Sequence, residues 1–254
     1  FMAIYPVKHV SWDEVVEWSA RLVAKVRGSG YKPDVVVAVG RGGYVVSRLL
    51  CDLLDVDRLI ALPIRWREQF RRRGEGYLAD LIRCFAKAKQ VDLCIADVVK
   101  RLSIEVVFNF DINLEGYNVL AVEEISATGL HLAKAKEIAL NNWRAGNVKT
   151  ATLVWKASTS PLKPDYVFIT TNSFVWFQFP WSRLSDYQQF AKVAMEEECR
   201  NSGKCQWTLD EVEKLFRKWY GFDADRKYLS MALEKLVELE VARKIGNAIY
   251  LILV

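Results

Sequence analysis

The sequence has few of the residues that build metal centres. It contains two histidines, His9 and His131, and five cysteines, none of which forms a Cys-x-x-Cys pair. Structural zinc sites need closely spaced cysteine and histidine ligands, so we expect none here. The cysteines are expected to be buried free thiols. A Cys199–Cys205 bridge is the alternative, because intracellular proteins of hyperthermophiles do use disulfides.

Long apolar runs are also missing. No stretch approaches about 18 consecutive apolar residues, the length that a membrane-spanning helix needs. The first residues lack the basic region and apolar run of a secretory signal. We therefore expect a cytoplasmic protein with no membrane partner. Apolar residues make up 52% of the chain, which is enough for a sizeable core.

Charge of one sign is in excess in a single segment. The chain has 36 Lys and Arg against 31 Asp and Glu, a net charge of +5. Residues 65–103 hold ten basic and five acidic residues, so this segment alone accounts for the excess. We interpret 65–103 as a charged insertion, mostly helical, with a helix over 77–89. Its Arg71-Arg72-Arg73 run is a candidate polyanion-binding loop; the alternative is an ordinary solvated loop.

Strand and helix patterns alternate along the first 170 residues. The β-branched run at 34–39 is typical of a parallel strand that is covered on both faces. Further strands are predicted over 59–64, 118–122, 150–155 and 166–170, and helices over 11–27, 44–54 and 130–143. This alternation predicts an α/β fold, a Rossmann-like doubly wound parallel sheet.

The pattern changes near residue 185. Helices are predicted over 186–200, after Thr208 and over 225–239, followed by a hairpin over 241–254 that turns at Gly246-Asn247. We expect an α/β domain over 1–184 and a small winged-helix-like domain over 185–254. Residues 206–254 hold eight basic and eight acidic residues, so nucleic-acid binding is possible but not favoured, and packing or oligomer contact is preferred.

Three segments that follow predicted strands carry polar or glycine-rich chemistry. Glycines in Gly40-Arg41-Gly42-Gly43 would let the backbone approach an anion at a helix N-terminus. The segment 123–131 opens with Glu123-Glu124 and continues through hydroxyl and glycine residues into a helix. Lys156 follows a third strand. The structural alternatives are a tight turn, a capped helix with two solvated acids, and a surface lysine.

An aromatic segment follows the last predicted strand of the sheet. It reads Val175-Trp176-Phe177-Gln178-Phe179-Pro180-Trp181. An indole ring can stack on a flat heterocycle, an interaction worth about 1–3 kcal/mol per base. The alternative is that Trp176 belongs to the hydrophobic core.

These motifs, in this order, resemble those of type I phosphoribosyltransferases. The resemblance covers roughly residues 10–183 and is closest to the 6-oxopurine enzymes, of the xanthine-guanine and hypoxanthine kind. It rests on Val39 to Gly43, Val122 to Gly129, Lys156, Asp165-Tyr166-Val167 and the segment 175–181. Such enzymes transfer 5-phosphoribosyl from phosphoribosyl pyrophosphate (PRPP) to a purine base, release pyrophosphate, use Mg²⁺ and are commonly oligomeric. The resemblance therefore implies a homo-oligomer, with a dimer expected.

The resemblance also implies a role for individual residues. Glu123 and Glu124 would be the catalytic acids that hold the ribose hydroxyls, in part through Mg²⁺. Lys156 would donate to the exocyclic oxygen of the base, Trp176 would stack on the base, and the Phe177 backbone would read its edge. PRPP and its phosphates would be bound by Arg41, Gly42, Gly43, Ser126, Ala127, Thr128, Gly129, Leu130 and His131.

The chain departs from the family pattern at three places. The usual Asp-Asp pair is Glu123-Glu124, and Ala127 stands where the 6-oxopurine enzymes carry an Asp. Leu130 and His131 replace small hydroxyl residues in the phosphate loop. The first expectation is thus a purine phosphoribosyltransferase. The alternatives are a weak or inactive relative that regulates or binds nucleotide with a winged-helix module, and an interaction or nucleic-acid module that uses 65–103.

Overall fold

The chain forms two compact units. One consists of the described residues of segments 11–67 and 103–173, here the sheet unit, and the other of those of segments 1–10, 68–102 and 174–254, here the helical unit. This partition places residues 1–10 with the C-terminal part; the predicted boundary between 184 and 185 stays a prediction. The structure is a computed structural model that describes residues 4–66, 80, 84, 94, 103–108, 110–160, 162–172, 175–246 and 249–252.

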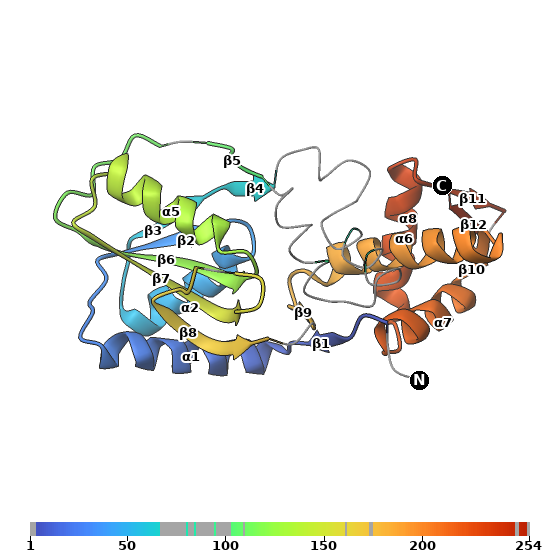
Figure 1. Cartoon of the computed structure of the whole chain (residues 1–254), viewed down its shortest axis with the longest axis horizontal. Helices are drawn as coiled ribbons and strands as arrows, with labels where there is room; N and C mark the ends of the chain where they lie inside the picture. Colours follow the sequence, from blue (N-terminus) through green and yellow to red (C-terminus); the bar gives the residue numbers. More distant parts are fainter. Residues whose placement is uncertain are drawn as a thin grey trace. The chain divides into compact units, whose positions relative to one another are not determined.

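The sheet unit is built on five parallel strands, as predicted. The strand order is β3-β2-β6-β7-β8. Figure 1 shows α5 over one face of the sheet and α1 and α2 over the other. The strands are β2 (Val35–Val39), β3 (Leu59–Leu62), β6 (Asn118–Ser126), β7 (Asn147–Lys156) and β8 (Tyr166–Thr171), and the helices are α1 (Trp12–Gly28), α2 (Gly43–Leu54) and α5 (Leu130–Asn141).

Local sequence explains why these elements form where they do. Every residue of β2 is buried, as expected for a strand covered on both faces. Helix α1 begins at a capping box in which the Ser11 side chain accepts from the Glu14 backbone and the Glu14 side chain accepts from the Ser11 backbone. The predicted fold class is confirmed in this unit.

Strand β6 is longer than predicted. Residues 123–126, which the sequence pattern assigns to a loop, are the last residues of the strand, with Glu123 opposite Thr152 and Ser126 opposite Trp155 of β7. The correction has a physical reason: a ladder of backbone hydrogen bonds to β7 continues past the apolar run that marked the strand in the sequence.

The charged segment 65–103 begins as a strand and not as a helix. Strand β4 (Ile64–Trp66) pairs antiparallel with β5 (Ile104–Val106), and these two form a ribbon. Most of the segment, including the arginines at 71–73, lies outside the described residues. Within it, Asp80, Cys84 and Cys94 are helical, and Cys84 and Cys94 form a disulfide.

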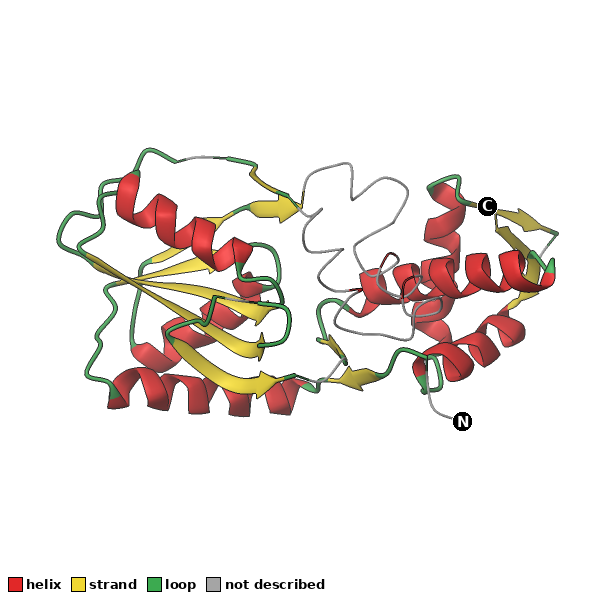
Figure 2. Cartoon of the chain, viewed as in Figure 1, coloured by secondary structure: helices red, strands yellow, loops and turns green. Residues whose placement is uncertain are grey.

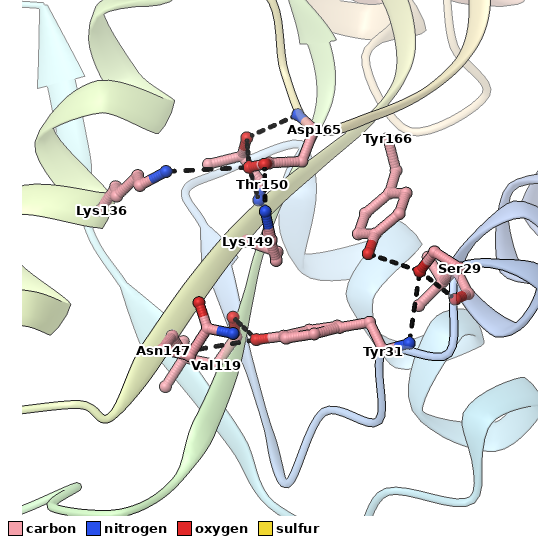
Figure 3. Close-up of polar contacts among 10 residues, drawn as sticks. Ser29, Tyr31, Val119, Lys136, Asn147, Lys149, Thr150, Asp165 and Tyr166 are labelled. Atoms are coloured by element: carbon pink, nitrogen blue, oxygen red, sulfur yellow. Dashed lines mark hydrogen bonds and ion pairs between the residues drawn. The ribbon is translucent and has the colours of Figure 1, made fainter.

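Polar contacts hold together the sheet edge where the strands begin (Figure 3). The Asp165 carboxylate accepts from the Thr150 backbone at 2.9 Å and from Lys149 Nζ at 3.0 Å. The Tyr31 hydroxyl donates to the Val119 carbonyl at 2.7 Å. These contacts join the segments that precede β2 and β8 to the first residues of β6 and β7, so they fix the edge opposite to the one where the strands end.

Among the described residues outside 68–102, the helical unit contains helices α6, α7 and α8 and two small sheets (Figure 2). The predicted hairpin is confirmed, with Gly246 at φ +60° in its turn, and β10 adds a third strand in the order β10-β12-β11. Strands β1 (Val7–His9) and β9 (Trp176–Gln178) pair in parallel. The other elements are α6 (Arg183–Ser202), β10 (Gln206–Thr208), α7 (Leu209–Tyr220), α8 (Arg226–Glu238), β11 (Ala242–Ile245) and β12 (Ile249–Ile252).

The cysteines correct a further expectation. Cys199 at the end of α6 and Cys205 just before β10 form a disulfide, so the alternative considered from the sequence holds for this pair. Cys51 is a free, buried thiol, as expected. Within the described residues, none of the helices combines the length and the apolar character that crossing a membrane requires.

Candidate active site at the carboxyl end of the sheet

The turn between β2 and α2 lies tightly against β6. A Cβ atom added to Gly42 would overlap the Glu124 carboxylate, and one added to Gly43 would lie 2.5 Å from the Val122 carbonyl oxygen. Gly43 therefore needs to be glycine because the neighbouring atom is backbone, whereas a side chain at position 42 would force the Glu124 carboxylate to move. Arg41 is exposed, and the peptide bond between Gly40 and Arg41 is cis. The turn thus places Arg41 next to a glycine that contacts Glu124 of β6.

The segment after β6 leads directly into a helix N-terminus. Gly129 has φ +76° and is the N-cap of α5. The Thr128 hydroxyl, which is buried, accepts from the Leu130 backbone at 3.3 Å. Backbone N–H groups and the positive end of the helix dipole make such a turn suitable for a phosphate. Ser126 is buried at the end of the strand, and Ala127 follows it.

The end of β7 is joined to this same segment. The Thr159 hydroxyl donates to the Ala127 carbonyl, and a Cβ on Gly129 would lie 2.8 Å from Ser160 Oγ. The Thr159 and Ser160 backbones both donate to the Lys156 carbonyl, at 3.1 and 2.9 Å. The turn after β7 therefore contacts the turn after β6, and the turn after β2 contacts the carboxyl-terminal part of β6 itself, as the topology of a parallel sheet predicts.

Lys156 is buried at the end of β7, so the alternative that it is a surface lysine is wrong. Its exposed fraction is 7%. Burial lowers the pKa of its ammonium group from 10.5 to about 8, because low-polarity surroundings disfavour the charged form. A lysine at this edge of the sheet can donate to a ligand that reaches the same edge.

His131 makes a contact that was not predicted. Its Nδ1 lies 2.8 Å from Glu123 Oε1, and each of the two side chains is 12% exposed. The Trp66 ring of β4 lies 4.5 Å from the His131 ring, centroid to centroid. The unusual bulk of His131 in a phosphate loop was the one signal in the sequence, and it did not identify Glu123 as the partner.

The two predicted base-binding aromatic residues belong to the helical unit. The Trp176 ring lies 6.3 Å from that of Tyr5 and 6.0 Å from that of Phe190, centroid to centroid, and packs on the core of this unit. Phe177 lies opposite Lys8 in the β1–β9 ladder. These contacts are the ones expected if Trp176 belongs to the hydrophobic core. The roles of Trp176 and Phe177 in binding a ligand stay predictions.

Asp186 is a buried acid next to this aromatic strand. Burial raises the pKa of its carboxyl to about 7, while hydrogen bonds with Ser182, Trp176 and Gln178 lower it. The Ser182 hydroxyl donates to Asp186 at 2.7 Å. Asp186 thus interacts with the side chain of the predicted stacking residue.

The residues at the site suit a Mg²⁺ ion only if the substrate phosphates and water supply most of its ligands. Within the described part of the chain, no group of three or more His, Cys, Asp or Glu side chains is placed to hold a metal ion. Mg²⁺ commonly keeps several waters and binds through one or two carboxylates plus substrate phosphates. Glu123 and Glu124, which lie near the carboxyl end of β6, fit that indirect mode.

Comparison with known proteins shows the family. Residues 11–187 match the phosphoribosyl transferase domain. The chain belongs to the phosphoribosyltransferase family. Membership makes it a phosphoribosyltransferase enzyme, as the resemblance of its motifs predicts.

Two solved structures share the fold of this phosphoribosyltransferase. The purine phosphoribosyltransferase from Pyrococcus horikoshii is 22% identical over 68% of this chain and 92% of its own, with a TM-score of 0.50. A hypothetical protein from Neisseria gonorrhoeae with bound ppGpp is 20% identical over 70% of this chain and 89% of its own, with a TM-score of 0.53. No curated protein sequence matches the chain.

Proposed function

We propose that this phosphoribosyltransferase transfers 5-phosphoribosyl from PRPP to a 6-oxopurine base and releases pyrophosphate. The observation that carries the proposal is that the turns after β2 and β7 both contact the carboxyl-terminal part of β6 or the turn that follows it. Gly42 lies against the Glu124 carboxylate, and Thr159 bonds to Ala127 next to the N-terminus of α5. A phosphate-binding turn, a pair of acids and a donor for the base are the parts that the reaction needs.

The reaction breaks the bond between the ribose C1′ and the pyrophosphate oxygen and forms one from C1′ to a ring nitrogen of the base, and the proton that the base loses is released to water. Positioning of the reactants and stabilisation of charge in the transition state account for most of the rate enhancement of such a transfer. Arg41, with Gly42 and Gly43, binds the leaving pyrophosphate. Glu123 and Glu124 accept hydrogen bonds from the ribose hydroxyls.

The 5′-phosphate binds at the N-terminus of α5. The segment Ser126 to Leu130 supplies backbone N–H groups and the Thr128 hydroxyl, and it opens the helix whose dipole favours an anion. Bound Mg²⁺ would offset the charge of the diphosphate. Ala127 has no group that can accept the proton of the base, so this side chain does not take part in proton transfer.

Lys156 selects the base. A lysine ammonium group only donates hydrogen bonds, so it pairs with the exocyclic oxygen of guanine, hypoxanthine or xanthine and not with the amino group of adenine. Trp176 stacks on the base and the Phe177 backbone contacts its edge. We further propose a cytoplasmic homodimer as the working form, for which a nucleic-acid partner is possible but not favoured.

The proposal is tested by turnover. The protein is mixed with PRPP, Mg²⁺ and each of guanine, hypoxanthine, xanthine and adenine, and nucleotide formation is measured by chromatography. We expect product with at least one oxopurine, little with adenine, and loss of product when EDTA removes the metal. Absence of nucleotide with every base, at high protein concentration and elevated temperature, would refute the enzyme proposal.

A second candidate is a weak or inactive relative that binds nucleotide and regulates through a winged-helix module. The observation in its favour is the phosphate loop, where Leu130 and His131 replace small residues and His131 bonds to Glu123. The Neisseria neighbour, whose structure holds ppGpp, shares the fold. Tight nucleotide binding without turnover, together with salt-dependent binding of duplex DNA, would favour this candidate over the first.

A further inference from the structure

We propose that His131 is a positioning residue that fixes the Glu123 carboxylate for recognition of the ribose hydroxyls. The inference rests on the proposed function, because it assigns Glu123 to the pentose of a phosphoribosyl ligand. It adds a residue that holds Glu123 in place, and it explains two of the departures from the family pattern together.

Three elements meet at this pair of side chains. Glu123 comes from β6, His131 from the first turn of α5, and Trp66 from the β4–β5 ribbon. The His131 Nδ1 to Glu123 Oε1 distance is 2.8 Å, and both side chains are nearly buried. The Trp66 ring lies against the imidazole at an interplanar angle of 37°, so the ring is held on one side by an aromatic contact and at one end by a carboxylate.

The direction of the hydrogen bond follows from the groups. A carboxylate only accepts, so Nδ1 of His131 carries the proton and donates it. One oxygen of Glu123 is then used, and the second remains for a ligand hydroxyl. Among the described residues, Nε2 of His131 is buried and has no hydrogen-bond partner. Glu123 is therefore the polar group through which His131 can act.

A longer acid needs such a contact. Glu123 has one more rotatable bond than the Asp expected at this position, and freezing an extra rotor on binding weakens affinity. A misplacement of about 1 Å can cost about 100-fold in rate. The imidazole of His131 restrains the longer side chain before the ligand arrives, whereas the small hydroxyl residue expected at 131 is too short for this contact.

The experiment measures how strongly the protein distinguishes ribose from deoxyribose. Guanosine 5′-monophosphate and its 2′-deoxy and 3′-deoxy analogues are titrated by calorimetry into wild type, His131→Ala and His131→Asn. The control is Lys134→Ala, on the same helix, whose side chain pairs with Glu137 at the surface. For each protein, the dissociation constant of a deoxy analogue is divided by that of guanosine 5′-monophosphate. The readout is this ratio for the analogue that wild type discriminates more strongly.

We expect His131→Ala to lower this ratio by about fivefold to tenfold, the effect of losing one oriented hydrogen bond. His131→Asn should retain most of the ratio, because the asparagine amide nitrogen can take the place of Nδ1. Lys134→Ala should leave the ratio within about twofold of wild type. A purely structural role would weaken binding of the nucleotide and of both analogues alike and leave the ratio unchanged, which would overturn the inference.

A second set of variants tests whether His131 acts through Glu123. In a Glu123→Ala background, His131→Ala should change the ratio by less than about twofold, because effects of residues that act as a unit do not add. Equal effects of His131→Ala in both backgrounds would contradict the inference.

Failure of this inference is distinguishable from failure of the proposed function. Wild type that neither turns over PRPP nor binds the nucleotide would remove both. Wild type that binds the nucleotide and discriminates the analogues, with a ratio that His131→Ala does not change, would remove the positioning role alone. Binding without discrimination of either analogue would also remove it.

Discussion

Replacing Lys156 by methionine should stabilise the folded protein and at the same time weaken its activity toward the oxopurine base. Burial lowers the pKa of Lys156 from 10.5 to about 8. One pKa unit corresponds to about 1.4 kcal/mol, so holding this charge in the folded state costs about 3 kcal/mol at neutral pH. Methionine has a similar length and no charge, so Lys156→Met should recover a large part of that cost at pH 7.

The sign of the pH dependence follows from proton binding. Below pH 8 the lysine is charged in both the folded and the unfolded state, and its burial cost is fully present. Between pH 8 and pH 10.5 the folded protein has released the proton while the unfolded chain still holds it, so this group makes stability rise with pH. The stability difference between Lys156→Met and wild type should therefore be largest below pH 8 and shrink toward pH 10.5.

Urea unfolding at several pH values between 6.5 and 10 measures this difference. Lys134→Met, on the exposed side of α5, controls for the exchange of a lysine for methionine. In the turnover assay, Lys156→Met should raise the KM for the oxopurine by about 10- to 100-fold, the loss of a hydrogen bond to a charged donor. A stability difference that does not vary with pH, or a variant less stable than wild type at pH 7, would refute the burial argument.

Three further predictions concern other parts of the molecule. Gly42→Ala should abolish turnover, since the new Cβ would displace the Glu124 carboxylate, and nucleotide formation measures it; wild-type rates would contradict the close approach. In wild type, Asp186 should make thermal stability fall between about pH 4 and pH 7, because a folded-state pKa near 7 lets the folded protein hold a proton that the unfolded chain releases near 3.8. Asp186→Asn should flatten this fall in a series of thermal unfolding measurements. An unchanged pH profile would contradict the prediction. Replacing Cys199 and Cys205 together by serine should cost about 2 kcal/mol of unfolding free energy, the entropy of a small closed loop, measured by urea unfolding against the oxidised wild type; equal stability would argue against the bridge.

Most of the sheet unit could be predicted because its signals are local. The β-branched run at 35–39 and the capping box at Ser11 each depend on residues close in sequence. The end of β6 could not be predicted in the same way. Residues 123–126 are polar or mixed, and they are strand because of pairing with β7, a contact between segments about 30 residues apart in the chain.

The candidate site divides along the same line. Glycine turns and acids at strand ends are visible in the sequence, since parallel strands bring such turns to one edge. The burial of Lys156 and the bond between His131 and Glu123 depend on packing by residues distant in sequence, among them Trp66. These contacts determine the electrostatics of the site. The sequence therefore predicts which residues lie at the site better than it predicts the burial and the hydrogen-bond partners of each one.

The position of Trp176 has a consequence for how the C-terminal helices should be tested. Trp176 packs on a core that also contains Phe190 of α6 and Phe216 of α7, and its strand pairs with β1. Removing the C-terminal helices would strip this core from the strand that is proposed to hold the base. Loss of purine binding after such a truncation would therefore reflect an unsupported Trp176 as well as any separate role of the helices. A substitution on their exposed surface, such as at Met231, which is 46% exposed, separates the two, because it leaves the packing around Trp176 intact.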